Sequence, residues 1–357
     1  MKVLSIIIII FSIIGAIDYI LNNRLGLGKE WEKGFHLLGT MSLSMIGMIV
    51  LAPWIGQLIS TGLGSVVSKM PFDISVIAGS LLANDMGGAT LALNIAQNEQ
   101  IGNFNGLIVG AMMGATISFT LPFAMTVVKK RQQKSVLFGI LCGIIAIPVG
   151  CFVAGLMAGI PLIELLANLI PLIILAILLA VGLAKIPDIC VKVLGVLTIG
   201  IKILIIFGLV VGMIRFLTGY ALIPSAAPIE EGVLIVFNIA VVMSGTFPLL
   251  HILSKLLRKP LVFLGKKMEM NETSTIGFIS TLATNVTTFG MMKDMDERGV
   301  ILNSAFAVSS AFVFADHLAF TMSFDKGFVP SMIVGKLVAG VLGVGIAWLA
   351  SKRKKDE

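Results

Sequence analysis

Residues 135–163 read SVLFGILCGIIAIPVGCFVAGLMAGIPLI and contain no charged side chain. A helix needs about 20 apolar residues to cross a bilayer, so this stretch is long enough to span a membrane. The pattern recurs along the chain, in uncharged stretches at 3–17, 34–68, 100–128, 165–184, 232–254 and 273–292 and in stretches with a single Asp or Lys at 193–214, 299–324 and 327–351. The sequence therefore predicts an all-α, polytopic bundle of transmembrane helices.

Composition supports the same class. The 357 residues are 57% hydrophobic and 13% charged, against roughly 25% charged in ordinary soluble domains, and the mean hydropathy is +1.04. The net charge of +7 comes from short basic clusters beside apolar stretches, which is typical of membrane topology signals and not of a nucleic-acid surface. The three cysteines have no paired spacing, so we expect no zinc site, no disulfide framework and no cofactor. The expected partner is the lipid bilayer, and the oligomeric state is left open.

Two segments contain too many polar residues for a lipid-facing helix. Residues 74–98 include Asn84-Asp85-Met86-Gly87-Gly88, which would bury a carboxylate and break the helix at the glycines. Residues 273–292 carry hydroxyl and amide side chains at Ser280, Thr281, Thr284, Asn285, Thr287 and Thr288. Both segments are predicted to be re-entrant or broken and to line a cavity.

Basic clusters at 129–134, 255–267 and 352–355 are expected in the cytoplasm. The second and third clusters lie on the same side only if segment 273–292 returns to the face from which it enters. With both polar segments re-entrant, nine helices cross the membrane, the N-terminus lies outside and the C-terminus inside. In the rival arrangement both segments span, which gives eleven helices.

Polar hairpins that enter from opposite faces are typical of secondary transporters with inverted repeats. We therefore expect an inverted-repeat bundle with three parts. These are a first half at 1–134 with the polar hairpin 74–98, central helices at 135–188, and a second half at 189–357 with the polar segment 273–292.

Ionisable side chains inside the bilayer cost at least about 2.5 to 3.5 kcal/mol each, so they are functional candidates. Five stand out, namely Asp85, Lys202, Asp316, His317 and Lys336. The structural alternative for the lysines is a buried ion pair, for example between Lys202 and Asp85 or Asp316.

Asp85 lies beside Asn84 at the predicted helix break, where freed carbonyls and a carboxylate would suit a cation. The predicted helix 299–324 brings Asp316 and His317 together with several aromatic rings, which suits an organic ammonium. The alternative is an Asp316–His317 network that locks this helix to a neighbour. The uncharged residues Thr284, Asn285 and Thr288 suit a substrate hydroxyl and a hydrogen-bonded hairpin tip equally well.

Residues 82–88, LANDMGG, and residues 311–321, AFVFADHLAFT, resemble the ethanolamine permease family, the EutH proteins of bacterial ethanolamine utilisation. The segments 26–30 and 282–285 are similar to that family as well, and the likeness runs along the whole chain. The resemblance implies a carrier in the bacterial cytoplasmic membrane that admits ethanolamine, and not an enzyme.

Combined with the residues, this resemblance suggests a binding mode. The ammonium would lie on Asp85 or Asp316, the ring of Phe314 or Phe320 would pack against it, and the hydroxyl would bond to Asn84, Asn285 or Thr288. Alternating access is expected. Proton coupling through His317, sodium coupling and uncoupled transport all remain open.

Other classes use the same charges. An inorganic-cation exchanger or channel would employ Asp85, Asp316 and Lys202. An intramembrane protease would use Asp85 and Asp316 as a catalytic pair, but neither residue lies in a G-x-G-D context. A purely structural membrane protein would not need polar hairpins near the midplane.

Overall fold

The computed structural model describes residues 2–67, 69–267 and 269–356. These residues are 86% helical and contain no β-strand. Eight of the described helices are long and apolar enough to cross a membrane, namely Val3–Ile20, Leu27–Gly62, Glu99–Val127, Lys130–Met157, Leu162–Lys185, Pro187–Thr218, Ile229–Leu256 and Lys326–Ser351. The predicted all-α, polytopic membrane bundle is therefore confirmed.

Most of these spans are single helices, but two contain π-helical turns. The single helices are α1 (Lys2–Ile20), α8 (Lys130–Met157), α9 (Leu162–Lys185), α10 (Pro187–Thr218), α11 (Ile229–Lys267) and α16 (Val329–Asp356), the last preceded by η6 (Lys326–Phe328). The second span joins α2 (Leu27–Met41), η1 (Ser42–Ile46) and α3 (Gly47–Val67). The third joins α6 (Glu99–Asn103), η3 (Phe104–Gly114), η4 (Thr116–Thr120) and α7 (Leu121–Val127).

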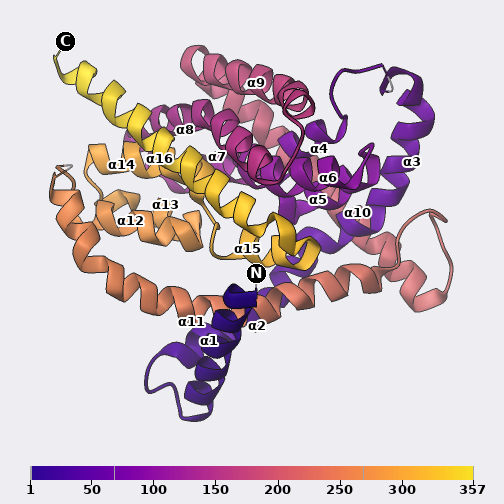
Figure 1. The fold of residues 1–357 in the computed structure, drawn as a ribbon, viewed down its shortest axis with the longest axis horizontal. Coiled ribbons are helices and arrows are strands. Elements are labelled where there is room, and N and C mark those ends of the chain that lie inside the picture. Colours follow the sequence, from indigo (N-terminus) through magenta and orange to yellow (C-terminus); the bar gives the residue numbers. More distant parts are fainter. Residues whose placement is uncertain (1, 68, 268, 357) are drawn as a thin grey trace.

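The elements form a core with an attached arm (Figure 1). Every residue of η3 is buried, and this π-helix packs against α8 and α16. Helices α1, α2 and α11 pack together along the lower edge of Figure 1 as the arm. Large apolar side chains on α1, α9 and α10 are exposed, as expected for surfaces that face lipid.

The first polar segment is a hairpin, as predicted. Helix α4 (Ser75–Leu81) ends in two extended residues, the short helix η2 (Asn84–Met86) follows, and α5 (Gly88–Ile95) begins after Gly87. Gly87 has φ +89°, a conformation that favours glycine. The backbone N–H of Gln97 donates to Asp73 Oδ2 at 2.7 Å, so the two ends of the segment meet. We call this segment hairpin 1.

The second polar segment has the same construction. Helix α12 (Glu272–Ala283) stops at the extended residue Thr284, and α13 (Asn285–Met291) and η5 (Met292–Asp294) lead back. The carboxylate of Asp296 accepts from the Asn271 N–H at 2.9 Å and from Ser274 Oγ at 2.6 Å, which again joins the two ends. This segment is hairpin 2. Because the ends of both hairpins meet, neither segment spans, and the eleven-helix arrangement is excluded.

The prediction of one continuous helix over 299–324 is wrong. Helix α14 (Glu297–Ser310) ends at a turn over residues 311–315, and α15 (Asp316–Phe324) follows. The backbone N–H groups of Phe312 and Phe314 donate to the carbonyls of Thr281 and Leu282 at the end of α12, each at 3.1 Å. Those carbonyls have no partner inside a helix that stops there, so hairpin 2 forces this third break. The described residues therefore contain eight unbroken helices long enough to span a membrane, whereas the sequence predicted nine.

Candidate functional site

Hairpin 1 is held against the π-helix η3 by a row of glycines. A Cβ atom placed on Gly106 would lie 2.6 Å from Ala89 Cα, and one on Gly110 would lie 3.2 Å from the backbone nitrogen of Asn84. One on Gly114 would lie only 2.0 Å from the Leu82 carbonyl oxygen. Glycine at these positions lets the broken backbone of hairpin 1 lie directly on η3.

The two hairpins meet at η4. Ser118 Oγ accepts a hydrogen bond from the backbone N–H of Ala83 at 3.1 Å, at the break in hairpin 1. Two residues later, Thr120 Oγ1 accepts from Asn285 Nδ2 at 2.9 Å, at the break in hairpin 2. One π-helical turn therefore positions both hairpin tips. Turns of this kind are often found at functional sites.

Charged side chains gather beside the tip of hairpin 1. Asp85 lies in η2, and α15, which begins with Asp316, contacts η2. Asp85 is also within electrostatic range of Asp316 and of Lys336 on α16. Lys336 is 1% exposed, and its ammonium donates to the carbonyl of Ala111 in η3. Among the described residues neither aspartate forms an ion pair, so the carboxylates remain available to a cation.

Several buried polar atoms around these charges have no partner within the described part of the chain. They are both amide atoms of Asn84, Oδ1 of Asn285, Oγ of Ser309 and Nδ1 of His317. The first three side chains are 0% exposed and His317 is 1% exposed. Unpaired buried polar atoms are costly, and in native proteins they are usually satisfied by water or a ligand. These atoms lie at or next to the three breaks in the helices, which makes this region the candidate site.

Two aromatic rings lie close to the His317 ring or to each other beside the break at residues 311–315. The ring of Phe312 lies 5.2 Å from the His317 ring and 5.9 Å from the ring of Phe119. Phe320 instead stacks on Phe324 at 4.5 Å, and Phe314 contributes its backbone N–H to hairpin 2. Phe312 belongs to the AFVFADH motif, whereas Phe119 was not among the site residues predicted from the sequence.

Other predicted residues have structural roles inside hairpin 2. Thr284 Oγ1 accepts from the backbone N–H of Val286 at 3.2 Å and so caps α13. Thr288 and Thr281 share a hydrogen bond of 2.9 Å between the two arms. Asn285 forms part of a hydrogen-bonded hairpin tip, because its Nδ2 is bonded to Thr120, while its Oδ1 has no partner among the described residues.

Two of the structural alternatives are not formed. Lys202 is exposed on α10 and makes no ion pair with Asp85, Asp316 or another residue that the structure describes, so the pairing considered for it is wrong. The side chains of Asp316 and His317 form no hydrogen bond with each other in the described structure, and His317 Nδ1 is unpartnered. The network that would have locked this helix is therefore absent.

The model of the family described as "Ethanolamine utilisation protein, EutH" matches residues 1–350. The chain belongs to the EutH family. Its relatives include a protein of Listeria monocytogenes named probable ethanolamine permease EutH, 42% identical over 99% of this chain and 95% of the relative. The Escherichia coli protein of that name is 34% identical over 98% of this chain and 95% of the relative. An uncharacterized Bacillus subtilis protein, YxeR, is 35% identical over 95% of this chain and 92% of the relative. No solved structure matches the chain.

Membership of the EutH family and the eight apolar helices identify a multi-pass bacterial membrane protein. The two motifs that carried the resemblance, at 82–88 and 311–321, are the backbone breaks that bring Asp85 and Asp316 to one place. In this EutH chain the most distinctive sequence and the charged site therefore coincide.

Proposed function

We propose that this chain carries ethanolamine, in its ammonium form, across the bacterial cytoplasmic membrane. Two EutH relatives bear the name probable ethanolamine permease, which supports this substrate. A primary alkylamine is protonated at neutral pH, as lysine is, so the carried species is a monovalent cation with a hydroxyl two carbons away.

The grouping of Asp85, Asp316 and Lys336 at one place is the observation that carries the proposal. With both carboxylates ionised, Asp85 and Asp316 contribute two negative charges and Lys336 contributes one positive charge. The imidazole of His317 is buried without a partner for Nδ1 and adds none in its neutral form. One monovalent cation neutralises the cluster, and a buried site favours neutrality strongly because its surroundings screen charge poorly.

Polar and aromatic neighbours suit an amino alcohol better than a metal ion. The free amide atoms of Asn84 and the free Oδ1 of Asn285 offer a hydrogen bond to the hydroxyl. The ring of Phe312, between His317 and Phe119, offers an aromatic face for the ammonium. Inorganic-cation exchange is the second candidate function, but it does not require an aromatic face beside the cation.

We propose alternating access for the transport step. The two hairpins would belong to inverted repeats in the halves 1–134 and 189–357, with 135–188 as the connecting helices. Asn84 and Asn285 each follow the extended break of a hairpin, and each hairpin has its ends joined by an aspartate, which supports this division. The site would be reached from either face as the repeats move relative to each other.

The test is uptake of labelled ethanolamine into proteoliposomes that contain the purified protein, under imposed proton, sodium and voltage gradients. Saturable uptake above empty liposomes is expected, and Asp85→Asn should abolish it while membrane insertion is unchanged. Glu99→Gln, which removes an exposed carboxylate at the start of α6, is the matched control and should transport normally. Uptake that equals the leak into empty liposomes would contradict the proposal, and gradient-driven flux of an inorganic cation instead would establish the exchanger.

A further inference from the structure

A largely apolar cavity with a few polar side chains opens between the arm and hairpin 2. It encloses about 610 Å³ and is lined on one side by Glu30 and Lys33 of α2 and His251 of α11. On its other side lie Thr284 and Thr287, next to the tip of hairpin 2. We call this cavity the vestibule. Its volume is several times that of a small amino alcohol, and its lining residue Thr284 precedes Asn285, whose Oδ1 has no partner among the described residues.

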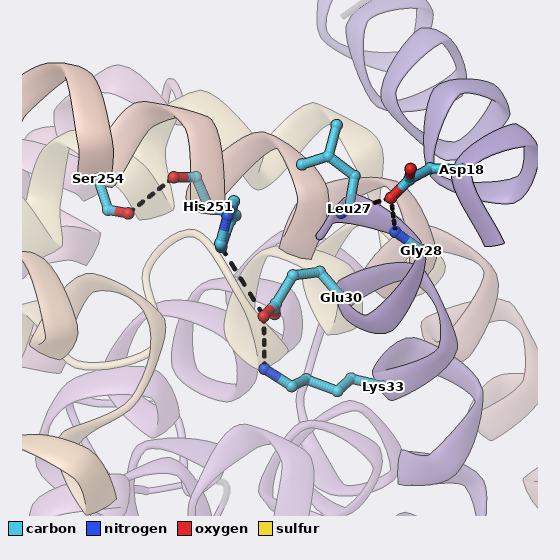
Figure 2. A network of polar contacts seen from close by, with 7 residues as sticks. All are labelled: Asp18, Leu27, Gly28, Glu30, Lys33, His251 and Ser254. Atoms are coloured by element: carbon cyan, nitrogen blue, oxygen red, sulfur yellow. Dashed lines mark hydrogen bonds and ion pairs between the residues drawn. The ribbon is translucent and has the colours of Figure 1, made fainter. Parts of the chain in front are cut away.

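Among the described residues that line the vestibule, Glu30 is the one with an acidic side chain (Figure 2). Its Oε1 accepts a hydrogen bond from Lys33 Nζ at 2.6 Å and lies 3.8 Å from His251 Nδ1. The Glu30 side chain is 19% exposed, whereas that of Lys33 is 59% exposed. The Glu30 carboxylate is thus held in the cavity wall, while the more exposed Lys33 ammonium can move into water.

The wall around Glu30 is firmly built. The carboxylate of Asp18 accepts the N–H groups of Leu27 and Gly28 at 2.8 and 2.9 Å, which fixes the start of α2 within a turn of Glu30 (Figure 2). Farther along α2, a Cβ atom on Gly34 would lie 2.5 Å from the backbone nitrogen of Ser244, so α2 and α11 are in close contact. Glu30 and His251 are therefore held in a fixed relation to each other.

We propose that Glu30 forms a second binding site for a primary ammonium, on the route between the aqueous phase and the central site. This inference rests on the proposed function. Lys33 demonstrates the fit, because its side chain ends in the same R–NH₃⁺ group and already occupies Glu30 Oε1 at 2.6 Å. Lys33 therefore occupies the position of the ligand ammonium, and an incoming ammonium would displace its side chain into solvent.

His251 completes a site for an amino alcohol. Its Nε2 is buried and has no hydrogen-bond partner among the described residues. A hydroxyl two carbons from an ammonium on Glu30 would lie within reach of the His251 ring, whose Nδ1 is 3.8 Å from Glu30 Oε1. Lys255 also borders the vestibule but is exposed at the end of the membrane-spanning part of α11, in the basic cluster expected on the cytoplasmic side. On uptake, the Glu30 site would thus be the last one that the substrate leaves.

Opposite effects of two substitutions in one ion pair distinguish this site from a structural salt bridge. Glu30→Gln removes the binding group and should abolish binding in the vestibule. Lys33→Met removes the competitor and should tighten it about two- to fivefold, because an exposed ion pair resists displacement only weakly. A gain in affinity cannot arise from misfolding.

The experiment is equilibrium binding of labelled ethanolamine to the purified full-length protein in detergent. The Asp85→Asn background removes the central site, so residual saturable binding reports the vestibule alone. That binding should disappear with Glu30→Gln and tighten with Lys33→Met. Glu32→Gln is the matched control, since Glu32 lies two residues away, pairs with His36 at 3.4 Å and is outside the vestibule lining.

Each other result overturns the inference. If Glu30→Gln and Lys33→Met both weaken binding or both leave it unchanged, Glu30 is part of a structural ion pair and the vestibule is only a passage. If the unaltered protein binds and transports ethanolamine but Asp85→Asn retains no binding, the vestibular site alone is refuted. If the unaltered protein neither binds nor transports ethanolamine, the proposed function fails together with it.

Discussion

Hairpin 1 and hairpin 2 share one construction but differ in charge and packing. Each consists of short helices interrupted by an extended break, and an aspartate joins its two ends, Asp73 in the first and Asp296 in the second. Hairpin 1 carries Asp85 and lies on the glycines of η3, whereas the second break carries the uncharged Asn285 and borders the vestibule. The difference suggests a division of labour, in which hairpin 1 holds the cation and hairpin 2 contacts the hydroxyl and borders the route.

The most severe test of this division is to move the carboxylate from one tip to the other. The double variant Asp85→Asn with Asn285→Asp keeps the number of charges but should stay at least about 100-fold below the unaltered protein in ethanolamine uptake. The reason is that Lys336 and Asp316 lie near hairpin 1, and truncating one member of a buried charged group typically costs 2–5 kcal/mol. Recovery of uptake in the double variant would mean that the two tips are interchangeable.

Lys336 provides the next test, because it offsets one of the two carboxylates. Lys336→Met should leave the site with an uncompensated negative charge, so that the substrate cation is released more slowly. Maximal uptake should fall on the order of tenfold, without a rise in KM. Lys202→Met is the matched control, since Lys202 is exposed and unpaired in the described structure, and it should transport normally. Equal losses in both variants would show that the position of Lys336 is irrelevant.

Packing around the hairpins can be probed with glycines. Gly114→Ala should destabilise the protein by about 1–3 kcal/mol, because its Cβ atom would lie 2.0 Å from the Leu82 carbonyl oxygen in hairpin 1. Gly290→Ala in hairpin 2 meets nothing within 4 Å and should cost no stability. The measurement is the Tm of the purified protein in detergent. A loss of stability for Gly290→Ala as large as that for Gly114→Ala would show that the two hairpins are equally tightly packed.

These contrasts also explain how much the sequence could predict. Both hairpins could be predicted because Asn84-Asp85 and Thr284-Asn285 are too polar for a helix that faces lipid. The break at residues 311–315 could not, since these residues are Ala-Phe-Val-Phe-Ala and give no local signal. It exists because the carbonyls of Thr281 and Leu282, far away in the sequence, take the N–H groups of Phe312 and Phe314.

The same limit applies to the partners of the predicted site residues. Asp85, Asp316 and Lys336 could be chosen because charge is expensive in a membrane, and the structure does bring them to one region. The carbonyl of Ala111 as the acceptor for Lys336 and Thr120 as the partner of Asn285 depend on tertiary packing. Lys202 was chosen because charge is expensive in a membrane, but it is exposed on α10 and lies outside the candidate site.

The smallest expected effect concerns the hydroxyl contact of hairpin 2. Asn285→Ala removes the free Oδ1 and should raise the KM for ethanolamine about fivefold, the value of one neutral hydrogen bond of about 1 kcal/mol. Ethylamine, which lacks the hydroxyl, should compete for uptake equally well against the variant and the unaltered protein. Competition against labelled ethanolamine measures both affinities. If Asn285→Ala weakened both amines equally, its effect would come from the lost bond to Thr120, and hairpin 2 would position the site without contacting the hydroxyl.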